Sequence, residues 1–185
     1  MPNIKARDII DIDEAGLELV SSNRWHGKYH KGERVREAGP YSKTGKVNLL
    51  LAISGDPDNP DRWHKIWSYG GTTISKFVAI IRRIIGDIGP STTSRRHCFT
   101  FNNLSAYLHP QVMVVIYQAG HRVVPRAPYW SVDGAIEYVF NTLQVLRCVN
   151  LQEIKDNDDL VNHIQNVFVN FERFTEYFRH VGFIL

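Results

Sequence analysis

The sequence has few cysteines and no long hydrophobic run. Its two cysteines, Cys98 and Cys148, are too few for a disulfide framework, and the apolar residues next to them, Phe99 and Val149, predict buried thiols in an intracellular protein. No apolar stretch reaches the ~18 residues of a membrane span, and no signal-peptide-like segment is present. These absences argue against secreted disulfide-rich proteins and against a membrane partner.

Motifs of several enzyme classes are also missing. The chain has eight histidines, but no paired Cys-x-x-Cys and no His-x-x-x-His on a predicted helix, so no zinc site is expected. It has neither a glycine-rich phosphate loop nor a Gly-x-Ser-x-Gly elbow. Nucleotide-binding and serine-hydrolase functions are therefore without support.

The composition is that of one globular domain, which we expect to span residues 1–185. With 43% hydrophobic and 22% charged residues the chain can bury a full core. The net charge of +3 permits a polyanionic partner, but 19 acidic residues against 22 basic ones argue against a uniformly cationic coat.

Apolar runs and helical stripes predict an α/β domain. Strands are expected at residues 7–12, 47–53, 98–101 and 122–125. Helices are expected from Thr72 or Thr73 to Gly89, from Pro110 to Gly120, from Asp133 onwards, and from about Asp158 to Phe174. This order predicts a mixed sheet flanked by helices.

Three polar residues fall at the ends of these elements. Asp13 lies in an acidic turn after the first strand, Asn102 follows the third strand, and Glu137 lies in the first turn of the third helix. Functional groups gather beyond the carboxyl ends of strands in such sheets, so these residues are expected to be neighbours. Asp11 lies on the same strand face as Asp13, and strand geometry alone does not separate the two.

Three motifs containing these residues resemble the catalytic domain of mariner-type DDE transposases, endonucleases of the DDE superfamily with an RNase H-like fold. The motifs are Asp13-Glu14-x-Gly16, the segment 99–105 around Asn102, and the segment from Pro128-Tyr129 to Ile136-Glu137. The 34 residues between Asn102 and Glu137 equal the family's interval. The resemblance extends over residues 8–183, nearly the whole chain.

The resemblance implies a set of roles. Asp13, position 102 and Glu137 would be the catalytic residues and the ligands of two Mg²⁺ or Mn²⁺ ions. The partner would be duplex DNA, which in the family is the transposon end. The protein would be nuclear, and a homodimer is possible. The family's helix-turn-helix region has no room before the first strand, so the chain is expected to lack it.

Asn102 departs from the family pattern, which has an aspartate at this position. Two ions ~3.5–4 Å apart stabilise the attacking and leaving oxygens of phosphoryl transfer. A carboxamide offers one neutral oxygen and an N–H donor, so we expect weaker ion binding and a rate loss on the order of 10³-fold or more. If Asp13 and Glu137 share a site, their carboxylates must lie within ~10 Å of each other.

Other departures concern Tyr107, where the family often has histidine, Leu108 in place of lysine, and Ala135 in place of proline. Asp133 has two explanations: it replaces the missing ligand, or it caps the third helix.

A basic, aromatic stretch at residues 23–36 is the remaining candidate. If this stretch forms a strand, its cationic side chains lie on one face and its aromatic side chains on the other, and the cationic face would bind DNA phosphates. The alternative is an edge strand kept soluble by its charges. Arg95, Arg96 and His97 would extend this patch, or form a solvated loop. The predicted nucleic-acid-binding residues are Arg24, Lys28, Lys31, Arg34 and Arg36.

The sequence thus predicts a transposon-derived DDE transposase domain that is catalytically degenerate. Three alternatives stay open: a non-enzymatic DNA-binding or assembly module, a folded relic, and an active nuclease in which Asn102 is tolerated or Asp133 substitutes.

Overall fold

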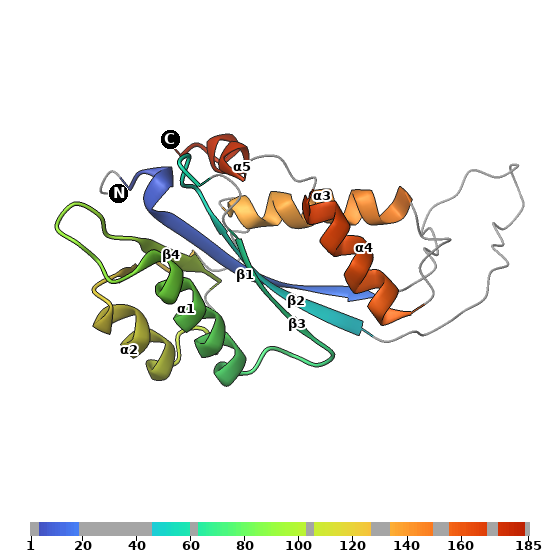
Figure 1. Ribbon diagram of the computed structural model, residues 1–185, viewed down its shortest axis with the longest axis horizontal. Helices are drawn as coiled ribbons and strands as arrows, with labels where there is room; N and C mark the ends of the chain where they lie inside the picture. The colour runs from blue at the N-terminus through green and yellow to red at the C-terminus, as the bar shows by residue number, and fades with distance from the viewer. Residues whose placement is uncertain are drawn as a thin grey trace, which may run out of the picture.

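The protein is a mixed β-sheet with helices on both faces (Figure 1). The computed structural model describes residues 4–18, 46–59, 63–102, 106–126, 134–149, 156–169 and 174–183. This architecture confirms the predicted α/β class. Within the described ranges, no helix combines the length and the apolar character needed to cross a bilayer.

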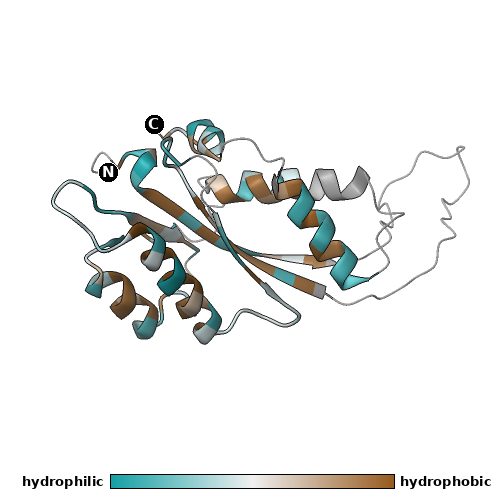
Figure 2. Cartoon of the chain, in the orientation of Figure 1, coloured by the Kyte–Doolittle hydropathy of each residue, from teal (hydrophilic) through white to brown (hydrophobic). Residues whose placement is uncertain are grey.

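The sheet has five strands in the order β3-β2-β1-β4-β5. Strand β1 pairs antiparallel with β2 and parallel with β4; β2–β3 is antiparallel and β4–β5 parallel. Strand β2 is nearly all apolar because helices cover both of its faces (Figure 2). The strands are β1 (Ile9–Glu18), β2 (Lys46–Ser54), β3 (Trp63–Ser68), β4 (Cys98–Phe101) and β5 (Arg122–Val123).

Helices α1 (Ile74–Ile88) and α2 (Pro110–Gln118) pack on one face of the sheet. The helix ends follow the predicted signals. Thr73 caps α1 by accepting a hydrogen bond from the Lys76 backbone N–H, Gly89 ends it with φ 75°, and Pro110 opens α2. A short 3₁₀ turn, η1 (Ala6–Asp8), precedes β1.

Helices α3 (Ala135–Val149), α4 (Asn157–Val169) and α5 (Thr175–His180) cover the opposite face. Strand β1 divides its side chains between the two layers. Ile10 and Ile12 pack against α1 and α2, whereas Ile9 and Leu17 face the other core. Asp11 and Asp13 alternate with Ile10 and Ile12, so both carboxylates lie on the α3 side.

Two sequence predictions about strands were wrong. The acidic turn at Asp13–Gly16 is part of β1, because its backbone pairs with β2 (Asp13 with Leu51, Gly16 with Asn48), so Asp13 lies inside a strand rather than at its end. Strand β3 was not predicted, because its polar His64 and Lys65 interrupt the apolar signal.

The predicted last helix was also wrong in extent, because it is two helices. Helix α4 ends at Val169, and Phe174 immediately precedes α5. Phe168 and Phe174 both lie in the same core, so the apolar spacing that indicated one helix is satisfied by two. The prediction of a buried thiol holds for Cys98, and burial raises its pKa to about 11, as expected for an unreactive core thiol. The side chain of Cys148 lies outside the described residues.

Candidate active site

The Asp13 carboxylate is buried on β1 and fully hydrogen-bonded by protein groups. Its Oδ1 accepts from the Glu14 backbone N–H (2.8 Å) and from Nδ2 of Asn102 (3.2 Å). Its Oδ2 accepts from Nδ2 of Asn102 (3.0 Å) and from Nη2 of Arg126 (3.1 Å). These four contacts occupy the ~four lone-pair positions that a carboxylate offers.

Asn102 lies beside Asp13, as the sequence predicts. Parallel pairing of β1 with β4 sets Ile12 against Phe101, so the next residue of each strand shares one face. The carboxamide presents its N–H₂ group to the carboxylate, and therefore acts as a donor to Asp13.

Arg126 is the central residue of the site, and it was not predicted from the sequence. The backbone N–H of Arg126 bonds to the Phe101 carbonyl beyond the end of β5, which directs the side chain under α3. Its Nη2 donates to the Ile12 carbonyl (3.2 Å) and to Asp13. The residue is 8% exposed. A lone arginine just before the Pro128-Tyr129 motif was the available signal.

Glu137 contacts the same guanidinium from α3. Its Oε1 lies 3.6 Å from Nη1 of Arg126, while Asp13 binds Nη2. Because the two nitrogens belong to one guanidinium, the two carboxylates meet the ~10 Å limit for a shared site. The Glu137 side chain is 29% exposed, so it forms the open side of the cluster.

Asp11 has a structural role that separates it from Asp13. Its Oδ1 accepts from the Thr100 hydroxyl (2.8 Å), and its Oδ2 accepts from the backbone N–H of Ile136 (3.1 Å) in the first turn of α3. It also lies 3.7 Å from Nη2 of Arg126. Asp11 therefore anchors the start of α3 to β1, whereas Asp13 is the carboxylate beside Asn102.

The cluster holds more negative than positive charge. Burial raises the pKa of Asp13 to about 6, and the nearby Glu137 adds to the rise, while Arg126 and the Glu14 N–H oppose it. Burial likewise raises the pKa of Asp11 against the opposing effect of Arg126. Perturbed acids of this kind gather at functional sites.

Gly134 provides the space for the guanidinium. A Cβ at this position would overlap Nη1 of Arg126 and lie 3.1 Å from its Cζ. The close approach of α3 to Arg126 therefore requires glycine.

Solved structures share this fold. The Mos1 mariner paired-end complex with Mn superposes with a TM-score of 0.70 at 14% identity, over 95% of this chain and 52% of the Mos1 chain. The catalytic domain of Mos1 mariner transposase gives 0.57 at 14% identity, over 95% and 76%. A simian T-cell lymphotropic virus intasome in complex with PP2A regulatory subunit B56 gamma gives 0.55 at 11% identity, over 88% and 49%.

The chain has the fold of a mariner transposase catalytic domain. It spans about half the length of the Mos1 chain in the paired-end complex. No protein-family profile and no curated sequence matches the chain. At 11–14% identity, the superpositions establish that the chain shares the RNase H-like fold of the transposase and intasome structures.

The residues around Asp13 do not fit the two divalent ions that the resemblance implies. The lone pairs of Asp13 are taken by N–H donors, Asn102 presents a donor, and a buried guanidinium lies among the carboxylates. Across the part of the chain that the structure describes, no three Asp, Glu, His or Cys side chains form a group suited to a metal ion.

The other residues predicted from the sequence lie elsewhere in the fold or fall outside the described residues. The nucleic-acid-binding candidates Arg24, Lys28, Lys31, Arg34 and Arg36, and the alternative ligand Asp133, fall outside the described residues. Tyr107 is buried against Phe77, with ring centroids 4.4 Å apart, and donates to Oε2 of Glu14 at 3.5 Å. Leu108 and Ala135 pack in the two cores.

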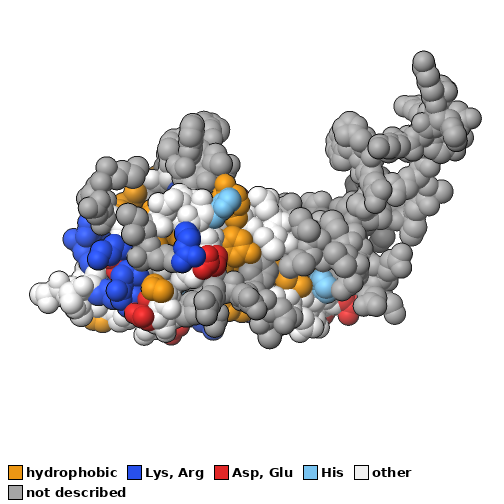
Figure 3. Space-filling model, turned by 90° about the horizontal axis from the view of Figure 1, so that it is seen from above, with side chains coloured by type: hydrophobic (Ala, Val, Ile, Leu, Met, Phe, Trp, Pro, Cys, Tyr) orange, Lys and Arg blue, Asp and Glu red, His pale blue; other side chains and the backbone are white. Residues whose placement is uncertain are grey.

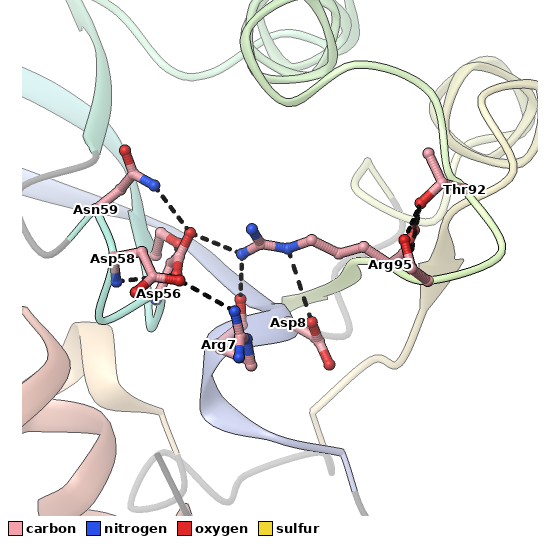
Figure 4. A network of polar contacts seen from close by, with 9 residues as sticks. Arg7, Asp8, Asp56, Asp58, Asn59, Thr92 and Arg95 are labelled. Carbon is pink, nitrogen blue, oxygen red and sulfur yellow. Dashed lines mark hydrogen bonds and ion pairs between the residues drawn. The ribbon is translucent and has the colours of Figure 1, made fainter.

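The basic segment before β4 lies at the opposite end of that strand from Asn102. Arg95 bonds to the buried Asp56 (2.7 Å) and to the Arg7 carbonyl (3.0 Å), so its role is structural (Figure 4). His97 is buried, whereas Arg96 is exposed. Figure 3 shows Lys and Arg side chains gathered at one end of the molecule.

Proposed function

We propose that this chain is a DDE transposase-type catalytic domain that engages DNA but has lost phosphodiester cleavage. The observation that carries the proposal is the saturated Asp13 carboxylate, which bonds to Asn102 and Arg126 at the position where the resemblance implies a catalytic metal ligand. The fold supports the family side of the proposal, and the donors at Asp13 support the loss of chemistry.

DNA is the proposed partner. The structures with the same fold include a Mos1 strand transfer complex and Mos1 transposase paired-end complexes, one of them with the left transposon end. Mos1 paired-end complexes are also solved with Mn and with Mg. For this chain we propose duplex DNA binding without the metal-dependent step, because the side chains around Asp13 are arranged to bond to one another.

A second candidate is a DNA-binding or assembly module with no inherited cleavage role. Three exposed cations favour it: Lys5 before β1, Arg96 before β4 and Arg122 at the start of β5. Because these three strands are parallel, their amino ends meet at one edge of the sheet. We call this set the basic edge; it would neutralise phosphates of a duplex.

The two candidates are tested together by DNA cleavage and DNA affinity. We expect wild type to leave supercoiled DNA intact in MgCl₂ and in MnCl₂. Nicking that disappears in Glu137→Ala would refute the loss of cleavage. The DNA affinity should fall with salt, and Arg96→Gln with Arg122→Gln should flatten that slope by roughly one unit per lost phosphate contact.

Arg82→Gln is the matched control for the basic edge, because Arg82 is an exposed cation that lies on α1 and not at the start of these strands. A slope equal to wild type in the Arg96/Arg122 variant would exclude the basic edge as the DNA surface. It would leave the 23–36 segment as the remaining basic candidate.

A further inference from the structure

We propose that Arg126 is a resident cation of the carboxylate cluster. Together with Asn102 and Gly134, it closes a latent divalent-metal site. The proposal rests on the proposed function for the origin of the site, and adds which residues close it. It follows that restoring aspartate at position 102 does not by itself restore metal binding, because Arg126 still occupies the cluster.

The charges support a coupled replacement. Asp11, Asp13 and Glu137 surround one guanidinium at 3.7, 3.1 and 3.6 Å. An aspartate at position 102 would add a fourth carboxylate against that single positive charge. Asn102 removes this negative charge and Arg126 supplies a positive one. Both residues therefore make the net charge of a cluster suited to divalent cations less negative.

The hydrogen bonds support the same conclusion. Each oxygen of Asp13 already accepts two N–H contacts, and three of the four contacts come from Asn102 and Arg126. A metal ion can bind these oxygens only if the donors leave. Arg126 is the stronger obstacle, because it is buried and tied to the Ile12 carbonyl as well.

Gly134 supplies an independent geometric observation. The helix α3 begins so close to Arg126 that a single methyl group at position 134 would collide with Nη1. The backbone at position 134 therefore leaves room for the guanidinium, and Arg126 acts as a positioning residue between β1 and α3.

The first experiment is calorimetric titration of MnCl₂ into four purified full-length proteins: wild type, Asn102→Asp, Arg126→Gln and the double variant. We expect the double variant to bind Mn²⁺ roughly tenfold or more tightly than either single variant, and wild type to show no saturable binding. If the double variant is unfolded without metal, recovery of helical circular dichroism on addition of MnCl₂ measures the same binding.

Arg95→Gln is the matched control, because it removes a guanidinium from another carboxylate group, and it should not change the Mn²⁺ response of Asn102→Asp. The proposal is overturned if Asn102→Asp alone binds Mn²⁺ as tightly as the double variant. It is equally overturned if the double variant binds no Mn²⁺ or if wild type binds it saturably.

The second experiment tests the packing without metal or DNA. Gly134→Ala should lower the melting temperature of wild type by roughly 3–10 °C, and this loss should shrink to less than half in the Arg126→Gln background. Gly86→Ala in α1 is the matched control, because a Cβ there meets nothing within 4 Å. An equal Gly134→Ala loss in both backgrounds would show that the guanidinium does not fill this space.

Failure of this inference is distinguishable from failure of the proposed function. Mn²⁺ binding and the Gly134 coupling are measured without DNA, whereas nicking and salt-dependent DNA affinity test the proposed function on the wild-type chain. A wild type that binds DNA without cutting it, but lacks the Arg126–Gly134 coupling, would refute only the resident-cation proposal.

Discussion

Two arginines lie within carboxylate groups at opposite ends of strand β4, and their surroundings differ in charge balance. In the Arg126 cluster, defined by Asp11, Asp13, Glu137 and Arg126, one guanidinium faces three acids. In the Arg95 network, defined by Arg7, Asp8, Asp56, Asp58 and Arg95, two guanidinium groups face three acids, and Asn59 adds a donor (Figure 4).

The difference appears in the acids themselves. Burial tends to raise the pKa of Asp56, but hydrogen bonds from Arg95, Asn59 and the Asp58 N–H outweigh it, so the pKa of Asp56 is lowered. For Asp13 burial prevails, and the pKa rises to about 6. A buried acid whose hydrogen-bond and charge partners lower its pKa has a structural role. A buried acid whose partners do not offset the effect of burial on its pKa is typical of a functional site.

The largest expected effect is the loss of Arg126. Arg126→Met should lower the free energy of unfolding by ~3–5 kcal/mol at pH 7, because it leaves buried carboxylates without their cation. Arg95→Met should cost less, since its side chain is 32% exposed. Urea unfolding of the two variants measures the difference, and a larger loss for Arg95→Met would invert the comparison between the clusters.

The pH dependence of stability should have opposite directions in the two clusters. The folded state holds the Asp13 proton more tightly than the unfolded state, so the free energy of unfolding falls as the pH rises from 3.8 to about 6, by ~3 kcal/mol. Asp56 has a lowered pKa, so its stabilisation is present above 3.8 and is lost as the pH falls through its folded value.

Comparison of Asp13→Asn with wild type by urea unfolding from pH 4 to pH 7 isolates the Asp13 contribution. The variant should lose the fall between pH 4 and pH 6. A wild-type curve parallel to that of Asp13→Asn over this range would show that Asp13 titrates normally.

A smaller effect is expected for Asn102→Asp. The substitution replaces two contacts from an amide donor by repulsion between adjacent carboxylates, so the free energy of unfolding should fall by ~2 kcal/mol at pH 7. The loss should diminish at pH 5, where the pair shares a proton. Thermal melts at both pH values measure this, and stabilisation at pH 7 without metal would contradict the donor role of Asn102.

The smallest effect belongs to the exposed rim of the Arg95 network. Arg7 and Asp58 pair at 3.1 Å, but their side chains are 42% and 70% exposed. Arg7→Gln should therefore change the free energy of unfolding by less than about 1 kcal/mol. If Arg7→Gln lowered the free energy of unfolding as much as Arg126→Met, side-chain exposure would not explain the difference in stability between the two clusters.

The sequence predicted the parts of the fold that local chemistry determines. Helix α1 follows its apolar stripe, its Thr73 cap and its Gly89 stop, and the Cys98–Phe101 strand is apolar at three of its four positions. Strand β3 was missed because its pairing with β2, and not its composition, makes it a strand. Strand β1 extends through an acidic segment for the same reason.

At the site, the sequence predicted the approach of Asp13, Asn102 and Glu137, because parallel strands and the start of a helix meet at one edge. It did not predict Arg126, because a single arginine carries no periodicity and its burial depends on carboxylates from two other elements. It also left Asp11 and Asp13 unresolved, since their difference lies in the Ile136 N–H that only tertiary packing brings to Asp11.

The most direct test of the account is a crystal structure of the wild-type chain grown with MnCl₂, with anomalous scattering measured for manganese. We expect no anomalous peak beside Asp13 and Glu137, with the Arg126 guanidinium bonded to Asp13 and the Asn102 amide donating to the same carboxylate. A manganese peak between Asp13 and Glu137, with Arg126 turned away, would contradict it.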